Sequence, residues 1–259
     1  MSSDSDIEID GNIFEEPEGY LPPPPEPTFE TYTRDSKYVK DGQPANVRMR
    51  LVGKSPLWGH LLWNAGKVTA DYMDLKRDEW ITGKTVLELG AAAALPSLLA
   101  SLTADNVVIT DYPDPDLIDN INENVKLLRE SVPNGAKLPI TVEGYIWGNP
   151  VDDLLNAKNQ NGRKFDLIIL SDLIFNHSEH EKLIRTCDKC LAPDGKLFVV
   201  FTHHRPKLAD KDLAFFPTAK EQAGFKSERI IEKKMTPMFE EEEETAHIRS
   251  MVYGYVVTR

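Results

Sequence analysis

Acidic side chains stand at the ends of apolar runs in the first half of the chain, with the spacing of a nucleotide-type site. Glu88 lies just before a turn of small residues at 90–94, and Asp111 closes a second apolar run twenty-three residues after it. A buried strand, a small-residue turn, a helix and a second strand ending in an acid form half of a Rossmann-type site. The residues expected to line a cofactor pocket are Glu88, Gly90, Ala91, Ala92 and Asp111.

The small-residue turn distinguishes between two cofactors that both offer a ribose to Asp111. A dinucleotide site has the pattern G-x-G-x-x-G, in which glycines let the backbone approach a pyrophosphate. Here Gly90 is followed by four alanines, whose methyl groups restrict positive φ angles. S-adenosylmethionine has no phosphate, so we expect this cofactor, with its ribose on Asp111 and its ammonium group toward Glu88. The alternative is a structural turn whose alanines pack in the core.

Three residues further along the chain fit the same pocket. Trp147 follows a weak strand at 140–142, where an adenine could lie against its ring. Ser171 and Asp172 close the apolar run at 165–170, which places them at the carboxyl edge of the sheet beside the cofactor's reactive end. A core tryptophan and an N-cap aspartate are the simpler interpretations of Trp147 and Asp172.

The elements that must position these residues alternate between strands and helices. We expect strands at 85–89, 107–110, 140–142, 165–170, 196–202, 226–232 and 249–257. We expect helices from residue 57, at 95–104, at 115–130, at 178–191 with Ser178 as N-cap, and at 218–223. This order predicts an α/β fold with a Rossmann-like seven-stranded, mostly parallel sheet and helices on both faces. An acidic loop without a crossover helix precedes the last strand, which is therefore expected to be antiparallel.

Composition limits the class of protein. The 259 residues are 41% hydrophobic and carry a net charge of −12, which argues against sequence-independent binding to nucleic acid or to anionic membranes. No apolar run approaches the roughly 20 residues of a membrane span, and the start lacks a signal-peptide pattern. Two cysteines favour a reducing, cytoplasmic location. Residues 1–50 form an acidic, proline-rich leader that we expect to be partly disordered.

Three other patterns have simple structural interpretations. His177, His180 and the pair at 203–204 could line a substrate groove, whereas a metal site would need a carboxylate or cysteine in register. Cys187 and Cys190 form a C-x-x-C well inside a predicted helix, so we interpret them as packing residues. The acidic run at 240–244 is either a solvated loop or a surface that attracts a lysine-containing substrate tail.

Six segments together resemble the seven-strand protein methyltransferases of the nicotinamide-N-methyltransferase-like family. They read LWGHLLWNAG at 57–66, VLELGAAAALPS at 86–97, TDYPDPDLIDNINENV at 110–125, YIWGN at 145–149, LSDLIFNHSEH at 170–180 and FTHHRP at 201–206. Within that family, the chain is most similar to fungal enzymes that methylate elongation factor 1-alpha at its N-terminal glycine and adjacent lysine.

The resemblance implies an S-adenosyl-L-methionine-dependent protein methyltransferase domain at 51–259, acting as a monomer on a protein substrate. It adds Trp58 and Tyr112 to the expected cofactor-binding residues, beside Trp147 and Ser171. Asp172 and Phe175 match the acid-x-x-aromatic motif beside the target amine, where the family more often has tyrosine at the last position. Two alternatives stay open. They are a non-catalytic cofactor-binding partner of a translation factor and a small-molecule N-methyltransferase.

Overall fold

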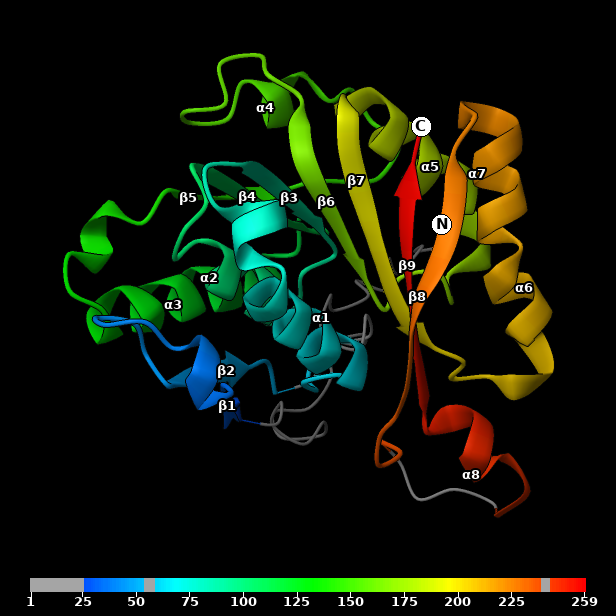
Figure 1. Ribbon diagram of the computed structural model, residues 1–259, viewed down its shortest axis with the longest axis horizontal. Coiled ribbons are helices and arrows are strands. Elements are labelled where there is room, and N and C mark those ends of the chain that lie inside the picture. The colour runs from blue at the N-terminus through cyan, green and yellow to red at the C-terminus, as the bar shows by residue number, and fades with distance from the viewer. Residues whose placement is uncertain (1–25, 54–58, 239–242) are drawn as a thin grey trace, which may run out of the picture.

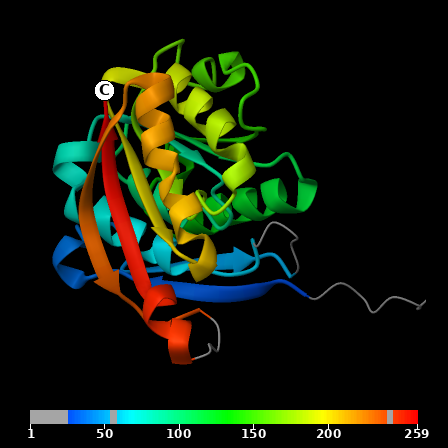
Figure 2. The same ribbon diagram turned by 90° about the vertical axis from the view of Figure 1, so that its right-hand side faces the viewer.

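The computed structural model describes residues 26–53, 59–238 and 243–259, and its centre is a seven-stranded sheet (Figures 1 and 2). In spatial order the strands are β5 (Ile140–Gly144), β4 (Asn106–Asp111), β3 (Thr85–Leu89), β6 (Phe165–Ser171), β7 (Leu191–Thr202), β9 (Met251–Thr258) and β8 (Lys226–Lys234). The first five are parallel, and β9 is antiparallel to both of its neighbours. The predicted fold and the antiparallel last strand are therefore confirmed, and that strand is inserted one position inside the sheet edge.

Helices cover both faces of the sheet, which explains why its central strands are apolar at successive positions. Val86 packs into the core beneath α1 (Asn64–Leu75), α2 (Leu95–Ala100) and α3 (Pro115–Ser131). Leu87 packs into the opposite core with α4 (Asp152–Leu155), α5 (His180–Cys190) and α7 (Phe215–Ala223). The short helices α6 (Ala209–Leu213) and α8 (Glu243–Arg249) follow β7 and precede β9. No helix within the described ranges has the length and apolarity to cross a membrane.

Single turns complete the secondary structure. They are 3-10 turns at Ser36–Tyr38, Gly135–Lys137, His177–Glu179 and Pro206–Leu208, and a π-helical turn at Arg77–Ile81.

The second half of the leader is folded into two strands that the sequence did not predict. β1 (Thr28–Thr33) and β2 (Asn46–Leu51) form an antiparallel hairpin, seen beside α3 in Figure 1. Val47, Met49 and Leu51 alternate along β2 and are buried in the core that lies under α1 and α3. The expected domain boundary at residue 51 therefore falls after a hairpin that packs on the domain. Residues 1–25 lie outside the described residues.

Buried polar groups tie this hairpin to the domain. The guanidinium of Arg34 makes a two-point ion pair with Asp74 of α1, at 2.8 and 2.7 Å. The amide of Asn124 on α3 accepts from the Arg50 backbone N–H at 2.6 Å and donates to the Arg50 carbonyl at 2.9 Å. The same amide also donates to the Ala93 carbonyl at 3.2 Å, so one side chain links β2 to the small-residue turn after β3.

Helix boundaries differ from the sequence predictions where loops carry apolar residues. α1 begins at Asn64 rather than at residue 57, and 57–58 lie outside the described residues. α2 ends at Ala100 instead of 104. Ser178 is not an N-cap, because its hydroxyl donates to the Asn176 side chain and α5 begins at His180.

The C-terminal third differs in two further places. β7 begins at Leu191 rather than at residue 196, and its pairing with β6 has a register irregularity between Phe165 and Leu167. β8 and β9 pair antiparallel, as expected for a connection without a crossover helix, but the short helix α8, which the sequence did not predict, lies just before β9. α7 ends before Gly224, whose φ of 69° forms a left-handed C-cap.

Candidate functional site

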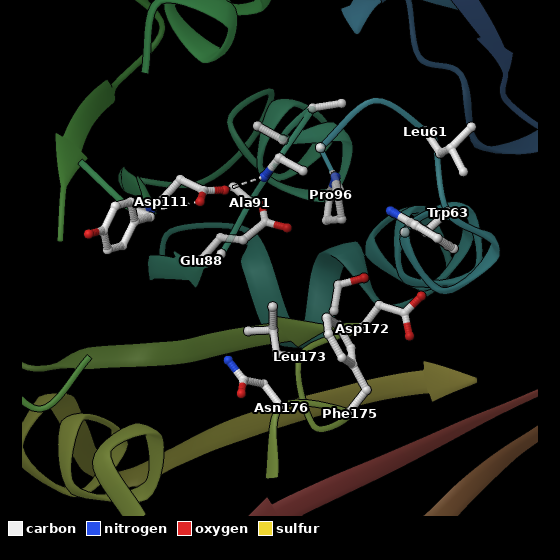
Figure 3. A pocket seen from close by; sticks show the side chains of 18 of the residues that line it. Leu61, Trp63, Glu88, Ala91, Pro96, Asp111, Asp172, Leu173, Phe175 and Asn176 are labelled. Atoms are coloured by element: carbon white, nitrogen blue, oxygen red, sulfur yellow. Dashed lines mark hydrogen bonds between the residues drawn. The ribbon is translucent and has the colours of Figure 1, made fainter. Parts of the chain in front are cut away.

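A cavity of about 810 Å³ lies at the carboxyl ends of β3, β4 and β6 (Figure 3). This volume is in the range of small-molecule and cofactor sites. Every expected site residue that the structure describes lines it, namely Glu88, Gly90, Ala91, Ala92, Asp111, Tyr112, Trp147, Ser171, Asp172 and Phe175. Trp58 lies outside the described residues. Asn176 and Ser178 also line the cavity and are exposed, so it opens to solvent.

The turn after β3 is held in a glycine-like conformation in spite of its alanines. Gly90 has φ of +62°, and a Cβ there would lie 2.6 Å from Leu173 Cδ2 and 3.3 Å from Trp147 Cζ2. A side chain at position 90 would therefore be strained and would have to displace the side chain of Leu173. Ala92 and Ala94 also have positive φ, of 48° and 62°. The expectation that alanines avoid this region is wrong at these two positions, where the left-handed conformation costs about 1–2 kcal/mol per residue.

Glu88 has a structural partner that the sequence did not predict. Its side chain is buried, and Oε2 accepts from the Ser97 backbone N–H at 3.1 Å, in the first turn of α2. Burial raises the pKa of Glu88 to about 8, against the opposing hydrogen bond from Ser97. Because Glu88 also lines the cavity, its interaction with a ligand ammonium group stays a prediction.

Asp111 joins the end of β4 to the small-residue turn. Its Oδ2 accepts from the Ala92 backbone N–H and its Oδ1 from the Tyr112 backbone N–H, both at 2.7 Å (Figure 3). Burial raises the pKa of the Asp111 carboxyl, and these two hydrogen bonds oppose that effect. A second contact runs from the Ala91 N–H to the Thr110 carbonyl at 3.0 Å. The acid therefore fixes the shape of the turn that it faces.

The remaining expected cofactor residues surround this turn. Trp147, in the loop after β5, lies against Gly90, and Tyr112 is 51% exposed at the rim. Ser171 ends β6, where its hydroxyl lies 3.4 Å from the Thr69 hydroxyl of α1. The structure thus places these side chains on one cavity, although they come from two loops and the end of a strand.

Asp172 lines the side of the cavity opposite the turn after β3, and three hydrogen-bonding contacts hold it in place. Its φ of +60° turns the chain sharply at the end of β6, and its backbone N–H donates to the Val200 carbonyl at 2.7 Å. Its Oδ1 accepts from the Thr202 backbone N–H at 3.3 Å, and its Oδ2 lies 2.9 Å from His204 Nε2. These contacts hold the carboxylate between the ends of β6 and β7.

Aromatic rings form a wall beside this carboxylate. His204 meets Trp63 edge to face with ring centroids 4.8 Å apart, and meets Phe175 in the same way at 6.2 Å. Arg205 donates to the Phe175 carbonyl at 2.7 Å. All four residues line the cavity. His204 therefore lines the cavity, its role toward a substrate stays a prediction, and its pairing with Asp172 was not predicted.

The other histidines have internal partners. His177 Nε2 and His203 Nδ1 each lie 2.6 Å from a carboxylate oxygen of Asp212, which is 2% exposed. His180 Nε2 lies 2.7 Å from the Ile174 carbonyl oxygen. Over the ranges that the structure describes, no group of three or more His, Cys, Asp or Glu residues is arranged to hold a metal ion.

Cys187 and Cys190 are free and buried inside α5, as expected for packing residues. Burial raises the pKa of both thiols, that of Cys190 to about 12. Most of the acidic run at 240–244 lies outside the described residues.

Comparison with known proteins assigns a family to this arrangement. A family model described as lysine methyltransferase matches residues 52–222. The protein N-terminal and lysine N-methyltransferase EFM7 of Yarrowia lipolytica is 49% identical over 271 residues, covering 98% of each chain. The protein of the same name from Candida albicans is 50% identical over 259 residues, covering 98% of this chain and 97% of its own. A solved Streptococcus mutans protein, described as an S-adenosylmethionine-dependent methyltransferase, is 12% identical with a TM-score of 0.56. The match covers 82% of this chain and 53% of that one, so it supports the fold alone.

Proposed function

The chain belongs to the lysine methyltransferase family and is an S-adenosylmethionine-dependent protein methyltransferase, and we propose that its acceptors are the N-terminal glycine amine and the adjacent lysine amine of translation elongation factor 1-alpha. The names of the relatives support both kinds of acceptor amine, and the resemblance of the six segments supports the elongation factor. One observation carries the proposal. A single cavity joins the turn after β3 to a buried acid and an aromatic wall.

The residues on the β3–β4 side fit S-adenosylmethionine. The Asp111 carboxylate has lone pairs beyond those used by the two backbone N–H groups, and these suit ribose hydroxyls. Trp147 and Leu173 offer apolar surface for an adenine ring. The buried carboxyl of Glu88 suits an ammonium group, which would favour its charged form. Gly90 keeps this space clear of a side chain.

The residues on the β6–β7 side suit an amine that must be aligned and kept neutral. When bound, the cofactor supplies a methyl group on a positively charged sulfur. An α-amine with a pKa near 7.7–8.0 is partly neutral at physiological pH, whereas a lysine with a pKa of about 10.4 must first lose a proton. Asp172 accepts a hydrogen bond from the amine and orients its lone pair, and alignment of this kind can supply a large part of a rate enhancement. Phe175 stabilises the methylated ammonium product by cation–π contact.

The test is a methyl-transfer assay with peptides that separate the two acceptors. The purified protein is incubated with tritium-labelled S-adenosylmethionine and a peptide beginning Gly-Lys, its N-acetylated form, or its Gly-Arg form. We expect label on all three, since each retains at least one acceptor amine, and no label on an N-acetylated Gly-Arg peptide. Intact elongation factor 1-alpha is the physiological substrate in the same assay, and mass spectrometry reads the number of methyl groups on each amine.

Two other outcomes would contradict the proposal in different ways. Label that appears only in small molecules of a cytosolic lysate would indicate a small-molecule N-methyltransferase. Cofactor binding without label on any acceptor would indicate a cofactor-binding partner of a translation factor. Both assays need the full chain.

Location and assembly are part of the proposal. The two free, buried cysteines fit a reducing compartment such as the cytoplasm, where we propose that the protein acts as a monomer. Light scattering on the purified protein tests the assembly state, and a mass near twice 29.2 kDa would contradict it.

A further inference from the structure

The carboxylate proposed to receive the amine is shared with a histidine from another strand. His204 follows β7, 32 residues beyond Asp172, and its Nε2 lies 2.9 Å from Asp172 Oδ2. The two side chains are 20% and 8% exposed, and both line the cavity. Thr202 holds the other carboxylate oxygen through its backbone N–H. Asp172 is therefore fixed at both oxygens by the end of β7, and His204 is the partner that can titrate.

Charged groups from three elements act on His204. Asp172 lies at the end of β6, Asp212 in α6 and Arg249 in α8, while the rings of Trp63 and Phe175 flank the imidazole. Burial disfavours the imidazolium form and Arg249 adds to that effect. The charge and hydrogen bond of Asp172, with a smaller contribution from Asp212, outweigh them and raise the pKa of His204 above its usual value. The pKa of the His204 ring therefore lies above its ordinary value.

We propose that His204 is a positioning residue for methyl transfer, active in its neutral form, in which Nε2–H donates to Asp172 and leaves the carboxylate charge free for the acceptor amine. The inference rests on the proposed function. An imidazolium at this distance would offset the charge of the carboxylate that accepts from the amine, and both side chains are largely buried, so solvent screens this effect only in part. The neutral ring holds Asp172 in the same orientation without offsetting its charge.

The sign of the pH effect follows from this difference between the two forms of the ring. Below the pKa of His204 the imidazolium offsets the charge of Asp172, and the rate with subsaturating peptide is low. As pH rises through that pKa, the proton leaves and the rate increases. The acceptor amine produces its own rise with pH, so wild-type activity alone does not separate the two groups. A variant that donates a hydrogen bond but does not titrate can separate them.

Two substitutions and one control make that separation. His204→Gln can place its Nε2–H close to the imidazole Nε2 position and carries no titrating proton. His204→Phe keeps an aromatic ring and removes the donor. His247→Gln on α8 alters an exposed histidine outside the cavity. For each protein, kcat and KM are measured from pH 6 to 9 with the Gly-Lys peptide and its N-acetylated form, and S-adenosylhomocysteine affinity is measured by calorimetry.

We expect His204→Gln to stay within about 3-fold of wild-type kcat/KM at pH 9 and to exceed wild type increasingly as pH falls, by up to tenfold per unit below the pKa. His204→Phe loses at least about tenfold in kcat/KM at every pH. Cofactor affinity stays unchanged in both, and His247→Gln matches wild type. A constant ratio of His204→Gln to wild type at all pH values would overturn the proposal. The proposal would also be overturned if His204→Gln were as inactive at pH 9 as His204→Phe. That result would mean that His204 itself takes up the proton that the acceptor amine loses.

A measurement without any acceptor keeps the inference separate from the proposed function. An NMR titration of the His204 ring, assigned by its disappearance in His204→Gln, gives the pKa of His204 directly. Asp172→Asn should lower that pKa, because the carboxylate charge is lost while the fold is kept. An unchanged pKa would refute the coupling even if methylation proceeds as proposed. If Asp172→Asn lowers the pKa of His204 but no peptide is methylated, the proposed function would be refuted. The interaction between His204 and Asp172 would still stand.

Discussion

The two sides of the cavity are built in different ways. The polar groups of the β3–β4 side come from a continuous stretch of chain, residues 86–112, and their contacts run mainly from backbone N–H groups to Glu88 and Asp111. The β6–β7 side joins Trp63, Asp172 and His204, which meet only because the sheet brings three distant segments to one edge. The residues of the first side can therefore be predicted from the sequence. The second side depends on a side-chain pair whose charge changes with pH.

Removing the charge of Asp172 should give the largest loss of activity. It should affect only the β6–β7 side of the cavity. Asparagine is the informative substitution, because it tolerates the positive φ of this position better than alanine. We expect Asp172→Asn to lower kcat about 100-fold, within the range for loss of a group that orients a reacting amine, with S-adenosylhomocysteine affinity nearly unchanged. Kinetics and calorimetry measure the two values, and Asp210→Asn, an exposed acid on α6, is the control. Unchanged turnover would remove Asp172 from the proposed site.

Asp111→Asn, on the β3–β4 side, should weaken cofactor binding and leave turnover largely unchanged. An asparagine cannot accept from both the Ala92 and Tyr112 N–H groups and also serve ribose hydroxyls as a carboxylate does. We expect cofactor affinity to fall about 10-fold, or 1.4 kcal/mol, while kcat at saturating cofactor changes less. Isothermal calorimetry reads the affinity, with Asp119→Asn on the exposed side of α3 as control. A loss of kcat at saturation with normal affinity would contradict the division of the cavity into two sides.

Glu88 should make the stability of the cofactor-free protein depend on pH. Its pKa is about 8 in the folded state, above the ordinary value of 4.5, so its contribution is fully present below pH 4.5 and is lost as pH rises through 8. We expect the wild-type Tm to fall between pH 6 and 9 relative to Glu88→Gln, by at least the 2–4 °C that 1 kcal/mol represents in a protein of this size. Differential scanning calorimetry measures Tm for both proteins at each pH. If the two plots of Tm against pH ran parallel, Glu88 would not be the source of the pH dependence.

The smallest effect tests whether the turn after β3 stores strain. Ala92 has a positive φ and its neighbour Ala93 does not. A glycine at position 92 would relieve about 1–2 kcal/mol of strain from the left-handed backbone conformation. This gain exceeds the conformational entropy that glycine adds to the unfolded chain, so Ala92→Gly should be more stable than wild type by up to about 1 kcal/mol. Ala93→Gly should lose about 1 kcal/mol, since it gains flexibility and loses a buried methyl group. Urea unfolding of the pair measures the difference, and equal values would indicate an unstrained turn.

The sequence predicted the sheet well, because its central strands are apolar runs that end in Glu88, Asp111 or Ser171. It failed for the hairpin of β1 and β2. Val47, Met49 and Leu51 alternate with polar residues, a period-two pattern that indicates a half-buried strand. The acidic, proline-rich composition of the leader obscured that signal.

The same contrast applies to the site. The cofactor turn was recognisable because its residues are adjacent in sequence. The contact between Asp172 and His204 was not, because it depends on the register of β6 and β7 and on the positive φ of Asp172. The position of His204 directly after a predicted strand was the available signal. The contact of Glu88 with the start of α2 was missed for a related reason, since it required the exact path of the turn.

The hairpin has a consequence for where this enzyme can be cut. The segment that matches the family model, 52–222, starts just after β2 and stops before β8 and β9. A chain trimmed to that segment would lose the buried ion pair between Arg34 and Asp74, and Asp74 would keep Arg77, at 2.9 Å, as its charged partner. Such a chain would lose the apolar side chains of β2 from the core. It would also remove β9 from between its neighbours. The stretch that the family model matches is therefore smaller than the packed unit, and domain grafts or shortened enzymes should keep the hairpin and the last two strands.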